Sequence, residues 1–363
     1  MTDFYEIDFL DVECAKSGDA ITIRYKKNGV QTIHITDGGF QGTGEKIARH
    51  LEEFYDSPNT IDRVIVTHPD GDHAGGLRHI LETYDVRELW MLRPWLYVDE
   101  IIDRFARFTN TENLAKRLKE VYPNIAALEE IAERKGVPIK EPFQGSRIGE
   151  FTVMAPTKSR YLDLVVESEK TPEEARSMIS EAKAGLEGFI DYAAASFRNL
   201  LKAAWGEEVF SPNETSAEND MSVVQYAELN SHKILLTGDV GRAGLKEAAE
   251  YAPYAGLTLP GIDKFQVPHH GSRRNVSTET LDMWLGERKE VPPAKGSETF
   301  SAIVSAAKED KHHPRNAVVR AMIHRGAKVI TNEGINIRIG QNAPAREGWG
   351  PVTPREYPDS QEE

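Results

Sequence analysis

The chain has a single cysteine among its 363 residues, and it contains no long apolar run. One cysteine excludes a framework of internal disulfides and is typical of a protein from a reducing compartment. No stretch approaches the roughly 18 consecutive apolar residues that a membrane span requires. The N-terminus lacks a basic region followed by an apolar segment. From sequence we therefore expect no signal peptide, a cytoplasmic location and no membrane partner.

Positive charge is also scarce, since 44 Lys and Arg stand against 58 Asp and Glu, for a formal net charge of −14. This balance argues against broad, nonspecific binding of nucleic acid, which requires a basic surface. It leaves room for a local positive site, because bound cations can dominate the field around them. With 39% hydrophobic and 28% charged residues, the composition is that of a globular protein with a sizeable core.

The most informative segment is Thr67-His68-Pro69-Asp70-Gly71-Asp72-His73-Ala74-Gly75-Gly76. It follows an apolar run at 61–66 and places two His and two Asp within six residues, where an expected strand gives way to a helix. Imidazole and carboxylate groups together suit a borderline or hard divalent cation. The alternative is a polar turn with an Asp as helix N-cap, although four ligand-type side chains so close together rarely serve one cap.

Two later segments also end apolar strands with ligand-type side chains. Leu235-Leu236-Thr237-Gly238-Asp239 delivers a carboxylate, and Phe265-Gln266-Val267-Pro268-His269-His270-Gly271-Ser272 delivers two histidines. Adjacent histidines point in different directions, so we expect at most one to bind a metal directly while the other orients substrate or a ligand. The alternative for Asp239 is an ordinary Asp in a turn. The alternative for the histidine pair is one buried and one solvated His without a metal.

The first motif resembles the His-x-His-x-Asp-His signature of the metallo-β-lactamase superfamily, with Asp70 where the second His usually stands. This variant, together with Pro-His-His-Gly-Ser at 268–272, is similar to the hydrolase domain of ComEC-type competence proteins and their free-standing relatives. Gly18-Asp19-Ala20 and Asp37-Gly38-Gly39 resemble early elements of the same family. The resemblance implies an α/β fold, a four-layer αββα sandwich, over residues 1–340.

Hydrophobic periodicity and turn signals predict the elements. Strands are expected at 4–13, 20–25, 31–36, 62–67, 88–92, 147–155, 221–229, 233–237, 263–267, 301–305, 328–331 and 335–339. Helices are expected at 44–56, 98–135 with a break near Pro123, 172–206, 242–251, 277–286 and 315–325. A helical insertion at about 157–217 departs from the family pattern and is a candidate lid or protein-partner surface. The tail at 341–363, rich in Pro, Gly and charge, is expected to be disordered.

The resemblance also implies a site with one or two divalent metal ions, Zn²⁺ by the habit of the superfamily or Mn²⁺ because Asp70 makes the site richer in oxygen. The expected metal ligands are His68, Asp70, Asp72, His73, Asp239 and His269. Asp239 would bridge two ions, Asp72 would also orient the attacking water, and His270 and His313 complete the expected catalytic residues. Side chains expected to support ligands or contact substrate are Asp37, Asn219, Ser222, Ser272 and Arg273.

Three functions remain open at this point. Two cations about 3.5–4 Å apart can share a hydroxide and clamp the oxygens of a displacement, which favours a phosphodiesterase or nuclease acting on nucleic acid or another phosphodiester. A hydrolase of a thioester, lactone or other small substrate is the second possibility, and a non-catalytic metal-binding interaction module is the third. The sequence shows no isolated His for the third motif of the superfamily, so the number of metal ions stays open.

Overall fold

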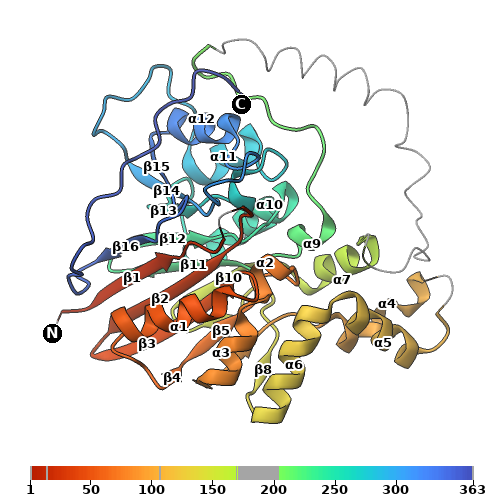
Figure 1. Cartoon of the computed structure of the whole chain (residues 1–363). Coiled ribbons are helices and arrows are strands. Elements are labelled where there is room, and N and C mark those ends of the chain that lie inside the picture. Colours follow the sequence, from red (N-terminus) through yellow and green to blue (C-terminus); the bar gives the residue numbers. More distant parts are fainter. Residues whose placement is uncertain (1, 14, 106–107, 169, 171–203, 362–363) are drawn as a thin grey trace.

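The structure is a computed structural model that describes residues 2–13, 15–105, 108–168, 170 and 204–361. These residues form a mixed α/β protein with two seven-stranded sheets and one two-stranded sheet (Figure 1). The helix predicted at 172–206, and most of the insertion predicted at 157–217, lie outside the described residues. Within the described ranges, no helix combines the length and the apolar character needed to cross a membrane.

The first sheet joins the start of the chain to its end. In spatial order its strands are β16 (Ile337–Gln341), β1 (Phe4–Phe9), β2 (Ala20–Lys27), β3 (Val30–Gly38), β5 (Arg63–Ile65), β7 (Leu89–Trp90) and β8 (Ile139–Lys140). The pairs from β16 to β3 are antiparallel, whereas β3, β5, β7 and β8 run parallel. Strands β4 (Thr60–Ile61) and β6 (Asp85–Val86) form the small sheet.

The second sheet has the same size and a similar mixture of pairings. Its strands in spatial order are β15 (Ala327–Thr331), β14 (Phe300–Val304), β13 (Lys264–Gln266), β12 (His232–Leu236), β11 (Val224–Leu229), β10 (Phe151–Ala155) and β9 (Arg147–Ile148). Strands β12 to β15 run parallel, and β9 to β12 pair in antiparallel fashion. The predicted strands are found with shifted ends, except that the range 147–155 forms two strands, β9 and β10, which pair in antiparallel fashion across a turn.

The described helices are α1 (Thr43–Phe54), α2 (Gly71–Ala74), α3 (Leu77–Thr83), α4 (Val98–Ile101), α5 (Thr111–Val121), α6 (Pro123–Lys135), α7 (Lys158–Glu167), α9 (Ala217–Asp220), α10 (Arg242–Tyr251), α11 (Thr278–Leu285) and α12 (Asn316–His324). Helices α1, α10, α11 and α12 lie within two residues of the predicted ranges, whereas the range 98–135 is interrupted between α4 and α5 as well as before Pro123. The bounds of helix α6 follow from its sequence, because Pro123 occupies the first helical position and Gly136, with φ 69°, ends the helix. Ser277 and Thr280 form a capping box at the start of α11.

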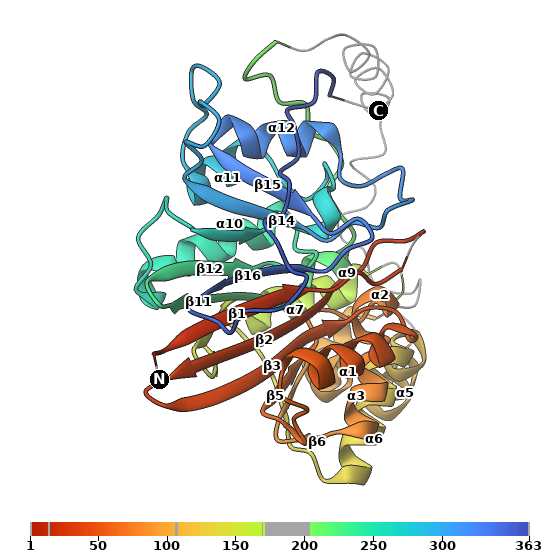
Figure 2. The same cartoon turned by 60° about the vertical axis from the view of Figure 1, so that its left-hand side comes forward.

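Three apolar cores hold the elements together. One lies between the first sheet and helices α1, α3, α5 and α6, and a second lies between the second sheet and helices α10, α11 and α12 (Figure 2). The third contains alternate residues of both sheets, among them Ile7, Ile23, Leu236 and Ile303. Because side chains alternate along a strand, this third core places one face of each sheet against the other.

The segment after β16, for which the sequence predicts disorder, has no helix or strand between residues 342 and 361. Its Arg346 nevertheless lies against the first sheet, where the guanidinium donates to Asp8 and Glu6 at 2.7 and 2.8 Å. Both carboxylates are fully buried, and buried charges require a partner. Composition alone does not predict this contact, because Arg346 and Asp8 are 338 positions apart.

Candidate metal centre

The candidate site lies where the carboxyl ends of strands from both sheets meet (Figure 1). Asp37 stands at the end of β3, and the loop after β5 carries His68 to His73 and runs into α2. In the second sheet, β12 leads to Asp239 and the parallel strand β13 leads to the histidine pair. The two parallel strand pairs, β3·β5 and β12·β13, thus deliver ligand-type residues at their carboxyl ends.

Asp37 holds the motif loop in place. Its backbone has φ 58°, a left-handed conformation that few residues other than glycine adopt. Its carboxylate accepts hydrogen bonds from the Thr67 N–H at 2.8 Å, from the Thr67 hydroxyl at 2.5 Å and from His73 Nδ1 at 2.8 Å. The last bond fixes the proton of a neutral His73 on Nδ1 and leaves the lone pair of Nε2 for the site.

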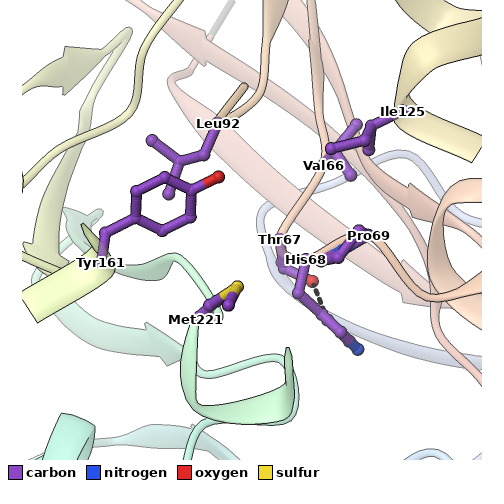
Figure 3. Close-up of a pocket in the computed structure, with 8 residues that line it drawn as sticks. All are labelled: Val66, Thr67, His68, Pro69, Leu92, Ile125, Tyr161 and Met221. Carbon is purple, nitrogen blue, oxygen red and sulfur yellow. Dashed lines mark hydrogen bonds between the residues drawn. The ribbon is translucent and has the colours of Figure 1, made fainter. Parts of the chain in front are cut away.

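The same chain of hydrogen bonds sets the orientation of His68 (Figure 3). Because the Thr67 hydroxyl gives its only proton to Asp37, it must accept from His68 Nδ1, which lies 3.0 Å away. Ser222 Oγ is 3.2 Å from the same nitrogen and accepts the main-chain N–H of Asp239. His68 Nε2 therefore bears a lone pair, and it is buried without a hydrogen-bond partner among the described residues.

His270 is oriented by the neighbouring strand. Its Nδ1 donates to the carbonyl oxygen of Ser305 at 2.9 Å, so Nε2 bears the lone pair and is likewise buried without a partner among the described residues. His269, His270 and Gly271 have φ values of 48°, 55° and 86°. Such conformations cost about 1–3 kcal/mol for each residue other than glycine, and they persist only where the surroundings enforce them. This turn presents two imidazoles to the site.

Asp239 is the point at which the imidazoles meet. Its Oδ2 lies 3.4 Å from the Nε2 atom of His73, 3.9 Å from that of His68 and 3.8 Å from that of His270. The ligand atoms of His68, His73 and Asp239 lie within 4.8 Å of one another, as do those of Asp72, His73 and His270. Buried polar atoms without partners are uncommon, and three imidazole nitrogens around a carboxylate are the donors that a divalent cation takes. The residues present fit such an ion.

His269 occupies a more open position than His270. Its Nδ1 lies 3.1 Å from Asp239 Oδ2 and accepts a hydrogen bond from Asn219 Nδ2 at 2.7 Å, and its side chain is 24% exposed. It is not part of the metal-ligand clusters that the described residues form. The sequence assigned the ligand role to His269 and the catalytic role to His270. The geometry favours the opposite assignment, because His270 and not His269 joins the clusters.

The two carboxylates of the motif loop differ in their surroundings. Asp70 Oδ1 contacts the Lys170 ammonium group, while Asp70 Oδ2 lies 4.0 Å from His68 Nε2. Burial raises the pKa of Asp70, and Lys170 acts against this shift. Asp72 is half-buried and belongs to one of the clusters with His73 and His270. Asp72 is thus close to the imidazoles, whereas Asp70 stands at the edge with a cationic neighbour.

The remaining predicted residues lie around this centre. The ring of His313 is 5.6 Å from that of His269 and 6.0 Å from that of His270, centroid to centroid, and Asp310 holds its Nδ1 at 3.1 Å. Ser272 accepts the main-chain N–H of Arg274 through its hydroxyl, which stabilises the turn. The carbonyl oxygen of Arg273 accepts from Arg242, and the Arg273 side chain is half-buried.

Burial and charge act in opposite directions on these groups. Burial lowers the pKa of His68 well below its usual range and lowers that of His270 to about 4, so both favour the neutral, ligating form. Burial opposes charge on His73 as well, yet Asp239 and Asp37 raise its pKa well above the usual range. The pocket is therefore strongly negative around His73, which is the potential that a cation would neutralise.

A small, mostly apolar pocket lies beside His68 (Figure 3). Its lining residues are Val66, Thr67, His68, Pro69, Leu92, Ile125, Tyr161 and Met221. In Figure 3 the Tyr161 side chain extends from α7 into this space with its hydroxyl group pointing inward. Burial raises the pKa of Tyr161 well above its usual range, so this hydroxyl stays protonated and can donate a hydrogen bond.

Sequence reasoning assigned no role to three residues that the structure brings to the centre. Asp19 is 1% exposed and joins Asp239 and His270 in one cluster and Asp37 and His73 in another. Gln266 donates to Asp19, and Ser305 orients His270. The only signal for Asp19 is its place in Gly18-Asp19-Ala20. Gln266 and Ser305 lie within ordinary strand sequences, which give no signal.

Residues 32–103 match a family model described as the metallo-beta-lactamase superfamily. No curated protein matches the chain at a significant level. The matched span includes Asp37 and the His68–His73 loop but ends well before Asp239 and the histidine pair. The assignment of Asp239 and His270 to the centre therefore rests on geometry alone. Their ligand atoms lie close to those of His68 and His73, which belong to the matched span.

Proposed function

We propose that the protein is a metal-dependent hydrolase of the metallo-β-lactamase type. The observation that carries this proposal is the convergence of the unpartnered Nε2 atoms of His68, His73 and His270 around Asp239. Each imidazole has its other nitrogen engaged by Thr67, Asp37 or Ser305. Such outer contacts orient metal-binding histidines in general, and a purely structural role would not require all three lone pairs to face one carboxylate.

The fold supports the same proposal. Two sheets that share a core and carry helices on their outer sides are what a four-layer αββα sandwich requires, and we assign residues 1–340 to that architecture. Of the insertion predicted at about 157–217, the described part begins with helix α7, whose Tyr161 lines the small pocket.

We divide the roles of the site residues as follows. His68, His73, His270, Asp72 and Asp239 would hold the metal, which would lower the pKa of water and stabilise negative charge on the substrate. His269 and His313 would face the substrate, because both are part-exposed and neighbour the ligand set. Asp37 positions His73 and the motif loop. This division exchanges the roles that the sequence suggested for the two adjacent histidines.

A phosphodiester, including nucleic acid, is the substrate that we propose first. Asp70, Asp72 and Asp239 give the centre several oxygen donors, which favour Mn²⁺ relative to an all-imidazole site. Lys170 lies at the edge of the centre through its contact with Asp70, and an ammonium group there can bind a phosphate oxygen as a point charge. The net charge of −14 favours a short or terminal segment over a long duplex lying across the surface.

A thioester, lactone or other small acyl substrate is the second candidate, and the apolar residues beside His68 favour it. Val66, Leu92, Ile125 and Met221 would suit an alkyl group better than a phosphate, but the cavity between them, at about 10 Å³, has room for no more than a water molecule. A panel of single-stranded DNA, RNA, a cyclic nucleotide, a chromogenic phosphodiester, a thioester and a lactone separates the two. Cleavage of only the last two would overturn the phosphodiester proposal and leave the metal centre intact.

Combined substitution of Asp72→Ala and His73→Ala should strip most of the bound metal. Both residues belong to one cluster, and His73 belongs to three of the four clusters that the described residues form. Metal content measured by mass spectrometry on folded protein tests this, with His79→Ala, which lies on the neighbouring helix α3, as the matched control. Unchanged metal in the folded double variant would contradict the centre, and a wild type without metal that cleaves nothing would favour an interaction module.

Asp70→His should shift the metal preference of the enzyme toward Zn²⁺. The change replaces a carboxylate by an imidazole close to His68 and removes the negative partner of Lys170, and imidazole is a better ligand for Zn²⁺ than for Mn²⁺. Metal-free protein reloaded with each ion separately, followed by phosphodiester turnover, gives the ratio of the two activities. An unchanged ratio would mean that Asp70 lies outside the metal's coordination sphere, and Asp70→Asn distinguishes loss of charge from gain of a ligand.

A further inference from the structure

Asp19 is fixed by both loops that build the centre. It precedes β2, and its main-chain N–H donates to the carbonyl oxygen of Asp72 at 3.1 Å while its own carbonyl oxygen accepts from the Gly39 N–H at 2.7 Å. The preceding residue, Gly18, has no room for a side chain, since a Cβ atom there would lie 2.6 Å from the Asp72 carbonyl oxygen. Asp19 is therefore locked against the motif loop rather than held in a free turn.

The orientation of the Asp19 carboxylate follows from Gln266. The Gln266 Oε1 atom accepts the main-chain N–H groups of Thr237 and Gly238, so its amide cannot rotate without losing both bonds. Its Nε2 must then donate to Asp19 Oδ2, at 2.9 Å. The other oxygen, Oδ1, is buried without a hydrogen-bond partner among the described residues, and a carboxylate oxygen of Asp19 lies within 4.8 Å of ligand atoms of both Asp239 and His270.

The negative charge around this oxygen is only partly balanced, by His73, whose Nδ1 lies 3.9 Å from Asp19 Oδ2. Asp19, Asp37 and Asp239 are each no more than 2% exposed. Buried charges are paired or coordinate metals, but Asp37 already accepts three hydrogen bonds, whereas one oxygen of Asp19 and one of Asp239 have no partner in the described part of the chain. Together with the His270 lone pair, the carboxylates of Asp19 and Asp239 form an oxygen-rich set of donors next to the imidazole-rich one.

We propose that Asp19 is a metal ligand and that, together with Asp239 and His270, it forms the second of two cation positions. This proposal rests on the proposed metal-dependent function and adds a ligand to which the sequence analysis gave no role. Asp239 belongs to both positions, the first of which contains His68 and His73. The second position has two carboxylates and one imidazole and therefore favours a harder ion, with Mn²⁺ the first to test.

The test compares the wild type with Asp19→Asn in the full chain. Asparagine keeps an oxygen for Gln266 to bond but places an amide N–H₂, which cannot ligate a cation, toward Asp239 and His270. Equilibrium dialysis against Mn²⁺, with metal counted by mass spectrometry, should give two ions per chain for the wild type. Asp19→Asn should hold one ion, with at least about 10-fold weaker binding of the second, the lower end of the loss seen when groups supporting a metal site are removed.

Asp310→Asn is the matched control, because it removes one negative charge whose hydrogen bonds go to His313, the His312 N–H and Ser17 rather than to the proposed ligands. It should keep both ions, and thermal unfolding should show that each variant remains folded. Two ions of unchanged affinity in Asp19→Asn would overturn the role of Asp19 while leaving the hydrolase proposal standing. A wild type that holds one ion would overturn the second position, and a wild type that holds none would overturn both proposals.

Discussion

Asp239→Asn should leave the protein folded and reduce the rate of hydrolysis at least about 10²-fold, on the order expected when one preorganised electrostatic group is removed from an active site. The fold should survive because the main chain of Asp239 is held independently of its carboxylate. Ser222 Oγ accepts its N–H, and Asn275 Nδ2 donates to its carbonyl oxygen. Only the carboxylate, which faces the imidazoles, changes.

The physical reason is the negative charge that the Asp239 carboxylate presents to the surrounding histidines. Burial raises the pKa of Asp239, but His73, His269 and His270 outweigh it and hold the pKa well below the usual range. A neutral amide in that position can neither bridge two cations nor balance charge on His73. Metal content should therefore fall together with the rate.

The measurement is turnover of whichever substrate of the panel the wild type cleaves, with metal content determined on the same sample. Asp263→Asn is the control, since Asp263 lies just before β13 on the same sheet and accepts the main-chain N–H of Lys233. This variant should keep wild-type activity. Near-normal turnover in Asp239→Asn would mean that the reacting centre lies elsewhere or needs no carboxylate at this position.

The sequence predicted the elements well where local signals govern the backbone. Helix α10 has the predicted range, because its apolar spacing and the glycine before it, Gly241, are local features. Strand β5 was predicted at 62–67 but ends at Ile65. The Thr67 N–H bonds the Asp37 carboxylate rather than another strand, and a contact across 30 positions leaves no local signal.

The candidate centre was also predictable only where a local sequence pattern marks its residues. Close spacing in the chain pointed to His68, Asp72 and His73 as candidates, and strand ends pointed to Asp239 and the histidine pair. The choice between His269 and His270 depends on positive φ values and on the carbonyl oxygen of Ser305, which a sequence pattern does not contain. Beyond its place in Gly18-Asp19-Ala20, Asp19 gives no sequence signal, because its bond with Gln266 joins residues 247 positions apart.

Another buried charge, that of Glu208, should contribute to the acid stability of the fold. Glu208 is 1% exposed at its side chain, and its carboxylate accepts hydrogen bonds from Arg325 at 2.6 Å, from His324 at 3.0 Å and from Thr278 at 2.7 Å. The Gly206 N–H donates to His324 Nε2, so the imidazole proton sits on Nδ1 and is given to Glu208. These bonds tie residues 204–208 to α11 and α12.

Glu208→Gln should lower the free energy of unfolding by about 3 kcal/mol, the lower end of the range for breaking a buried ion pair. The loss stays at that end because Arg325 keeps Asp282 as a partner at 2.6 Å. Urea unfolding at pH 7 measures the change. Glu287→Gln, an exposed site on the neighbouring loop, is the control and should change stability by less than about 0.5 kcal/mol.

The pH dependence distinguishes lost charge from lost packing. Burial alone would raise the pKa of Glu208, but hydrogen bonds from His324 and Arg325 outweigh it and lower the pKa from 4.5 to about 2. A carboxyl whose pKa is lowered on folding stabilises the protein fully above its unfolded value, and this contribution is lost as the pH falls through the folded value. The wild type should therefore lose the Glu208 contribution between about pH 4.5 and 2, and the difference in stability from Glu208→Gln should shrink over that window. A difference that stays constant from pH 6 to pH 2.5 would show that the glutamine destabilises through packing, with no contribution from the carboxylate charge.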